Sequence, residues 1–234
     1  MWYWNKTNFE GLEAIGQLMM QEPDLQLYAE YCEWRVKGVR KKALQAITKF
    51  ANYAAKWDFE KRKGFTDWLL TLQKVNRGVH QLIPFQVSSQ IIEPTLEEWI
   101  QVADEDVKAQ RWFGIVFRSY EALEKATNLD ADEILARRTL IDWLSHELWF
   151  ATHHLPDYFI GEPEELNSVI SQVDKLLAEL PESEHHTRLA EKHKQQVQLV
   201  NDWKTFKAQG LTDFKLWCAQ QGRVYAWVAA DYYT

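Results

Sequence analysis

The sequence predicts an all-α protein, organised as stacked antiparallel helix pairs in the manner of an α-solenoid or an irregular helical bundle. Helix breakers are few, with nine glycines and six prolines in 234 residues. Apolar residues recur at helical spacing along most of the chain. Twelve tryptophans, 11 phenylalanines and nine tyrosines supply bulky side chains through which long helices pack. The hydrophobic fraction of 46% and the charged fraction of 26% are those of an ordinary globular protein.

The segment 106–155 is the expected centre of the fold, as two long helices that meet at residues 128–132. The second helix carries one apolar stripe, made of Ile134, Ile141, Leu144, Leu148, Ala151 and Leu155. A second face of the same helix carries Leu140, Trp143, Phe150 and His154. The first helix also has two apolar faces, and a helix of this kind is covered on several sides by other elements. We therefore expect this pair to form a middle layer, with Leu144 and Leu148 almost fully buried.

Four helices are expected in residues 1–75, at about 9–20, 22–38, 39–56 and 58–75, with Gly38 ending the second. Residues 76–93 lack a helical pattern, and a loop of this length in a compact domain is usually functional or contains unrecognised structure. We expect it to connect an N-terminal helical half, residues 1–75, with a C-terminal half, residues 94–234, in one compact unit. Thr95 is the expected N-cap of the next helix, with Glu98 completing a capping box.

Three helices are expected after the central segment. An amphipathic helix begins near Leu166 and is ended by Pro181, and a more polar helix follows and stops at Gly210. Thr212 is the expected cap of a last short helix that ends at Gly222.

Two fragments, residues 62–69 and 137–144, share the pattern basic-basic-x-apolar-x-Asp-Trp-Leu. The likeness arises either by chance in a tryptophan-rich helical chain or from duplication of a helix pair. Duplication predicts that Trp68 and Trp143 occupy equivalent places.

Residues Tyr120 to Asp132 resemble the end of the second helix of a tetratricopeptide repeat and the turn into the next repeat. Ala126 and the pair Leu129-Asp130 match the pattern of that family, whereas Ala131 stands where the family usually has proline. The resemblance covers 13 residues and does not extend to the family's first-helix pattern. It implies α-solenoid-like helix pairing and, because the concave face of that family binds peptides or proteins, a protein-binding function.

The charge is unevenly distributed along the chain. The formal net charge is −7, but residues 1–80 hold 13 Lys and Arg against nine Asp and Glu, and the remaining residues hold 14 against 25. The acidic part argues against general nucleic-acid binding, which needs an extended basic face. A basic cluster of Arg35, Lys37, Arg40, Lys41 and Lys42 is either a solvated corner or a contact for an acidic partner.

The sequence gives no indication of a membrane or secreted protein. The start shows no signal peptide, and no apolar run reaches the ~18 residues that a membrane-spanning helix needs. Cys32 and Cys218 are the only cysteines and do not form a C-x-x-C motif. We expect a cytoplasmic protein.

No catalytic or cofactor motif is present, and no cofactor is predicted. Nucleotide-binding glycine patterns are absent. The candidate metal ligands are His153, His154 and Asp157, or His185, His186 and His193 with Glu182, and neither group has an established three-ligand spacing. The alternative to a binding protein is therefore a metal-dependent helical hydrolase that uses His153, His154 and nearby carboxylates.

These observations predict a protein-binding helical module, in a sharper form an inhibitor or immunity-type protein that masks a basic partner. The expected binding residues are His153, His154, Asp157, Tyr158 and Phe159, in a turn flanked by Pro156 and Pro163. Prolines stiffen such a turn and lower the entropic cost of ordering it on binding. Alternatively, the two aromatic rings fold onto the following helix and belong to the core.

Overall fold

The computed structural model describes residues 6–227, which form helices and no strand and confirm the predicted all-α fold of antiparallel helix pairs. The chain divides between Ala122 and Leu123 into two compact units, called here the first and the second unit. The division falls within helix α8 (Tyr120–Leu129), whereas residues 76–93, the predicted connection, lie inside the first unit. In the described part of the chain, no helix is long and apolar enough to cross a membrane.

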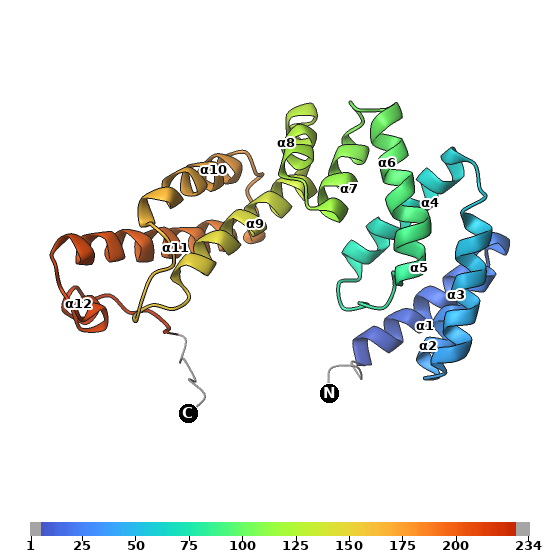
Figure 1. Ribbon diagram of the computed structural model, residues 1–234, viewed down its shortest axis with the longest axis horizontal. Coiled ribbons are helices and arrows are strands. Elements are labelled where there is room, and N and C mark those ends of the chain that lie inside the picture. Colours follow the sequence, from blue (N-terminus) through green and yellow to red (C-terminus); the bar gives the residue numbers. More distant parts are fainter. Residues whose placement is uncertain (1–5, 228–234) are drawn as a thin grey trace. The chain divides into compact units, whose positions relative to one another are not determined.

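The first unit begins with α1 (Lys6–Met20), α2 (Gln26–Val36) and α3 (Arg40–Ala54), which pack as successive neighbours (Figure 1). A short 3-10 turn, Pro23–Leu25, precedes α2. Tyr28 is completely buried, and its ring stacks on Phe50 with ring centroids 4.9 Å apart. Gly38 ends α2 with a φ of +72°, a left-handed conformation that favours glycine, as predicted.

Helix α4 (Phe59–Val75) begins at Asp58, whose carboxylate accepts a hydrogen bond from the amide of Lys61 (2.8 Å). After a turn, the chain becomes helical again through α5 (Phe85–Val87), a π-helical turn (Ser88–Ile92) and α6 (Glu93–Val102). The later part of residues 76–93 is therefore helical and packs against α3 and α4.

The capping box predicted at Thr95 is wrong, because the helix begins upstream of it. Thr95 lies inside α6, is completely buried, and its hydroxyl has no hydrogen-bond partner. Glu98 instead pairs with Arg62 of α4 (2.6 Å). A proline inside a helix has no amide hydrogen to donate, and its ring crowds the carbonyl one turn earlier. The wider π turn that ends at Ile92, two residues before Pro94, accommodates both effects.

The predicted long helix before residue 128 is two helices, α7 (Val107–Phe117) and α8, which are separated at Arg118. Arg118 adopts a left-handed conformation with a φ of +56°, which ends α7. The hydroxyl of Ser119 accepts a hydrogen bond from the amide of Ala122 (3.2 Å) and caps the start of α8.

Helix α7 is joined to α4 through Asp67. The carboxylate of Asp67 accepts hydrogen bonds from the indole of Trp112 (2.7 Å) and the ammonium of Lys108 (2.8 Å). Burial alone would raise the pKa of Asp67. The hydrogen bonds from Lys108 and Trp112, together with the charges of Lys108 and Arg111, outweigh burial and hold this pKa below its ordinary value of 3.8.

In the second unit, α9 (Ile134–Thr152) packs against α10 (Leu166–Ala178) and α11 (Glu184–Ala208), as Figure 1 also shows. Their shared core consists of Ile141, Leu144, Leu148, Val169, Val173, Leu177 and Leu180. Leu144 and Leu148 are 4% and 0% exposed, so the predicted burial of this stripe is confirmed.

A second core cluster of this unit joins the end of α9 to α11 and α12 (Phe214–Gln220). It consists of Leu155, Trp203, Phe206, Phe214, Trp217 and Cys218. Asp213 caps α12 by accepting from the amide of Leu216 (2.8 Å), so the prediction of Thr212 as the cap is wrong by one residue. Gly210 and Gly222 have positive φ angles at the predicted helix ends.

The two fragments with the shared Asp-Trp-Leu pattern agree in part of their environment. Both leucines, Leu69 and Leu144, are buried, and Trp68 and Trp143 are both partly exposed. The aspartates differ, because Asp67 is paired with Trp112 and Lys108 whereas Asp142 is exposed. Duplication of a helix pair therefore stays a prediction.

Candidate functional site: an exposed array of aromatic and histidine rings

The end of α9 and the turn after it are fixed on both sides to the core of the second unit. Thr152 closes the helix by donating its hydroxyl to the carbonyl of Leu148 (2.9 Å). Leu155 is 2% exposed and packs into the cluster around Trp203. Further along, the amide of Ile160 donates to the carbonyl of Ala151 (2.9 Å), so the chain folds back onto the helix end. The backbone between these attachment points is therefore held in place, and Asp157 and Tyr158 within it are exposed.

Five side chains in this region form a continuous array on the surface, called here the ring surface: Trp149, Phe150, His153, His154 and Tyr158. The rings of Trp149 and His153 stack with centroids 4.7 Å apart, and those of His154 and Tyr158 stack at 4.5 Å. The two histidine rings join the stacks at 4.0 Å, and Phe150 contacts His153 at 5.4 Å. Trp149, Phe150 and Tyr158 are 45%, 51% and 47% exposed, so the array presents three large apolar side chains to solvent.

The five predicted binding residues have different positions. His153, His154 and Tyr158 lie together in the ring surface, and Asp157 beside them is exposed. Phe159 turns the other way and stacks on Trp203 of α11 at 6.1 Å, as part of the second core cluster. Packing onto the core thus describes Phe159, whereas binding through the exposed Tyr158 stays a prediction.

Sequence reasoning missed Trp149 and Phe150 as members of this site. Phe150 was expected on a covered second face of α9, but it is 51% exposed, although Leu140 on the same face is buried. The available signal was spacing, because residues three and four apart in a helix lie on the same side. Trp149 and Phe150 precede His153 by four and three residues.

The hydrogen bond at His153 fixes the roles of its two ring nitrogens. Its Nδ1 lies 2.7 Å from the carbonyl oxygen of Phe150. A carbonyl oxygen only accepts hydrogen bonds, so Nδ1 donates, and in the neutral ring Nε2 is left as an acceptor. The ring surface therefore combines apolar faces with a directed acceptor.

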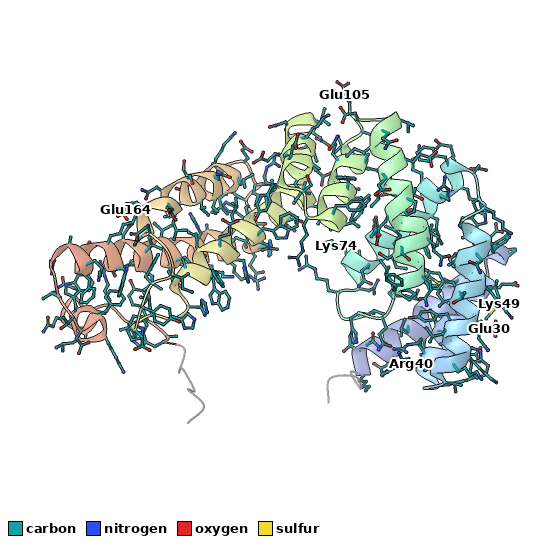
Figure 2. All side chains as sticks on the ribbon, in the orientation of Figure 1. Glu30, Arg40, Lys49, Lys74, Glu105 and Glu164 are labelled. Carbon is teal, nitrogen blue, oxygen red and sulfur yellow. The ribbon has the colours of Figure 1, made fainter. Side chains whose placement is uncertain are left out.

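Acidic side chains follow the ring surface along the chain. Asp157, Glu162, Glu164 and Glu165 are exposed, and Glu164 is labelled in Figure 2. Residues 123–234 hold 11 Lys and Arg against 18 Asp and Glu, whereas residues 1–122 hold 16 of each. The whole net charge of −7 thus belongs to the second unit, whose net electrostatic field is negative.

The histidines do not assemble a metal site in the part of the chain that the structure describes. Residues 6–227 contain no group of three or more His, Cys, Asp or Glu side chains that could hold a metal ion. In the second histidine group, His193 is buried rather than a surface residue, and its Nε2 lies 3.0 Å from Asp174. His186 instead contacts the carbonyl of Leu177 (3.2 Å). The hydrolase hypothesis thus has no ligand set in these residues.

The chain matches no family model, no curated protein and no solved structure. The resemblance of residues 120–132 to a tetratricopeptide repeat stays a prediction.

Proposed function

We propose that the protein is a protein-binding helical module that captures a basic partner at the ring surface, as an inhibitor or immunity-type protein does. The observation that carries this proposal is the array itself, in which Trp149, Phe150 and Tyr158 are each about half exposed and joined by two histidines. Aromatic residues are enriched at the centres of protein interfaces and supply a large share of hot-spot residues.

The exposed rings are large enough to matter for affinity. A fully buried aromatic side chain covers roughly 150–250 Å², so three half-exposed rings offer roughly 300 Å². At about 25 cal/mol per Å², covering them contributes ~7 kcal/mol before the entropic costs of association are subtracted. The rings are already stacked on one another and on a fixed turn, so little side-chain freedom remains to be lost on binding.

The exposed acidic residues that follow the ring surface along the chain suggest the kind of partner. Exposed carboxylates contribute to association rate and to selection between partners more than to affinity. A partner with lysines or arginines around an apolar patch matches both features of this surface. Binding to such a patch masks it, which is the physical basis for an inhibitor.

The test is a comparison of three tagged full-length chains in affinity capture from cells of the source organism, followed by mass spectrometry. The double variant Trp149→Ser, Tyr158→Ser removes two exposed rings, and Leu216→Ser alters a side chain of α12 that is 55% exposed in the same unit. We expect the parent chain and Leu216→Ser to capture the same basic protein and the double variant to lose it. Capture of that protein by all three chains, or capture of acidic proteins alone, would refute the proposal.

A further inference from the structure

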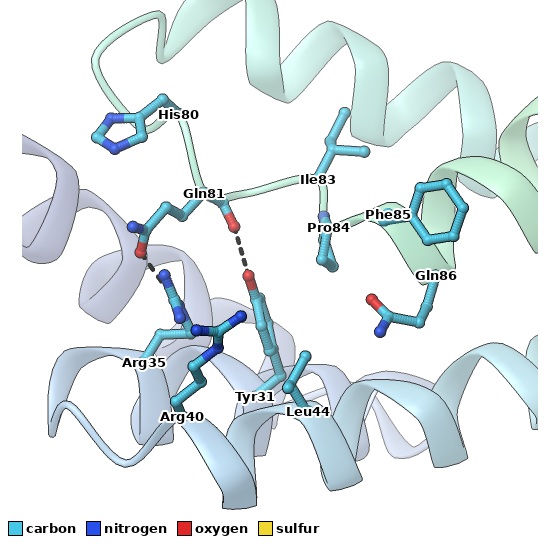
Figure 3. A pocket seen from close by; sticks show the side chains of 10 residues that line it. All are labelled: Tyr31, Arg35, Arg40, Leu44, His80, Gln81, Ile83, Pro84, Phe85 and Gln86. Carbon is cyan, nitrogen blue, oxygen red and sulfur yellow. Dashed lines mark hydrogen bonds between the residues drawn. The ribbon is translucent and has the colours of Figure 1, made fainter. Parts of the chain in front are cut away.

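We propose that the first unit has a second, independent binding site, a cationic groove that takes an acidic peptide segment with an apolar side chain from a partner protein. The groove has a volume of about 650 Å³. Its lining includes the basic side chains Arg35, Arg40 and His80 and the apolar side chains Leu44, Ile83 and Phe85. In Figure 3 the helices carrying Arg35, Arg40 and Leu44 face the segment 80–86 across it.

The far wall of the groove is fixed in place. The main-chain carbonyl of Gln81 accepts a hydrogen bond from the phenol of Tyr31 (2.7 Å). The main-chain amide of Gln81 donates to the side-chain oxygen of Asn8 (3.2 Å). The side-chain oxygen of Gln81 accepts from Nε of Arg35 (3.1 Å), and the bonds from Tyr31 and Arg35 are drawn in Figure 3. The next carbonyl, that of Leu82, accepts from Tyr28. A groove whose walls are already joined needs little ordering when a ligand enters.

The charge in the groove is of one sign. No carboxylate is among its lining residues. Arg35 and Arg40 point from the helices toward the segment 80–86 (Figure 3). Within residues 6–227 the guanidinium of Arg40 makes no ion pair. Arg40 is also the first residue of α3, which has no acidic residue in its first turn and no side-chain cap. Positive charge at a helix start is unfavourable, so an anionic ligand here offsets a cost that the free protein carries.

The groove also has an exposed apolar part. Phe85 is 78% exposed and Leu44 is 39% exposed, and Ile83 and Pro84 lie between Gln81 and Phe85 along the segment 80–86. Neither Phe85 nor Leu44 belongs to the buried core of the first unit. A ligand with both carboxylates and an aliphatic or aromatic side chain satisfies the two parts of the groove together.

A peptide fits these features better than a nucleic acid does. Phosphate backbones are recognised by an extended basic face. Here two arginines and a histidine line the groove itself, and the first unit as a whole holds equal numbers of basic and acidic residues, 16 of each. Aspartate and glutamate side chains carry single charges at separate positions, which matches separate guanidinium groups beside apolar contacts.

The experiment is selection of a phage-displayed library of random short peptides against the immobilised full-length chain. The chain carries Trp149→Ser and Tyr158→Ser, so that the ring surface does not contribute. Two further variants, Arg40→Glu and Lys49→Glu, change the net charge equally. Figure 2 labels both residues on α3, but only Arg40 lines the groove.

We expect enriched peptides to combine Asp or Glu with a neighbouring apolar residue. A labelled copy of an enriched peptide should lose about tenfold or more in affinity with Arg40→Glu, equivalent to ~1.4 kcal/mol, and much less with Lys49→Glu. Phe85→Ser should weaken binding several-fold. Because glutamate suits the start of a helix, Arg40→Glu should keep or raise the melting temperature, so its loss of binding does not reflect unfolding.

Three outcomes would overturn the proposal. The first is that no acidic peptide is enriched above the unselected library. The second is equal loss of affinity with Arg40→Glu and Lys49→Glu, which indicates a general effect of charge. The third is tighter binding of a single-stranded oligonucleotide than of the best peptide at the same salt concentration, which makes the groove a nucleic-acid site.

Discussion

Shortening Leu148 to alanine tests whether α9 is the central helix of the second unit. Leu148 is 0% exposed and packs in the cluster that α9 shares with α10. The substitution removes three carbon atoms, and at ~0.8 kcal/mol for each the transfer contribution is ~2.4 kcal/mol. The space left behind adds to this, because Val173 and Leu177 belong to another helix and relax only partly. We expect a total loss of ~3–4 kcal/mol in the free energy of unfolding.

The assay is urea unfolding combined with hydrogen exchange of amides in α9, α10 and α11. Leu216→Ala makes the same chemical change at a side chain that is 55% exposed, and it should cost less than ~0.5 kcal/mol. Protection of the amides in the three helices should fall together in Leu148→Ala, because they share one cluster. A loss below ~1 kcal/mol, or a loss equal to that of Leu216→Ala, would mean that α9 is not the centre of this core.

Two further predictions concern ionisable groups. Because the pKa of Asp67 is held below its ordinary value of 3.8, its pairing stabilises the fold above that pH and this stabilisation is lost as the pH falls through the lowered value. Asp67→Asn should therefore cost about 1 kcal/mol at neutral pH and have no effect in strong acid, and a pH-independent difference in urea unfolding would contradict the role of the charge. Burial raises the pKa of Cys32 to about 12 and that of Cys218 to about 11. Both thiols should resist an aromatic disulfide reagent in the folded protein and react in guanidinium, and mass spectrometry that finds either labelled in the native state would argue against this burial.

The part of the fold that sequence predicts well is the part with a strong period and clear stops. The stripe through Leu144 and Leu148 repeats over several turns, and only burial against neighbouring helices gives such a pattern. Gly38, Gly210 and Gly222 end helices because positive φ angles favour glycine. These signals are local or periodic, so a single sequence contains them.

The errors arise where tertiary packing overrides a local signal. Arg118 breaks the helix before residue 128 without glycine or proline, and the cap that follows it, Ser119, was expected in the interior of a continuous helix. Thr95 looks like a cap because Pro94 precedes it, but the π turn before Pro94 keeps the chain helical. Whether an arginine adopts a left-handed conformation, or a helix widens by one residue, depends on contacts that a single sequence does not specify.

Sequence reasoning identified the segment that holds the candidate site, but not which of its side chains belong to the site. Tyr158 and Phe159 are adjacent in a turn, and nothing in the sequence says which ring meets Trp203 and which meets His154. The turn decides this, because Leu155 and Ile160 fix its two ends and leave one ring on each side. A prediction at the level of the segment was therefore possible, and one at the level of the ring was not.

The rings of the ring surface lie outside the buried core clusters of the second unit. On α9, Leu148 and Ala151 face the core, whereas Trp149 and Phe150 between them are about half exposed. Scattered apolar side chains on a surface need no explanation, whereas a contiguous group of large ones supports the proposed interaction site. Polar residues at these two positions would leave the core cluster unchanged and lower the risk of aggregation. Under the proposed function a partner surface covers these rings, and the carboxylates that follow the array along the chain favour a basic surface for that role.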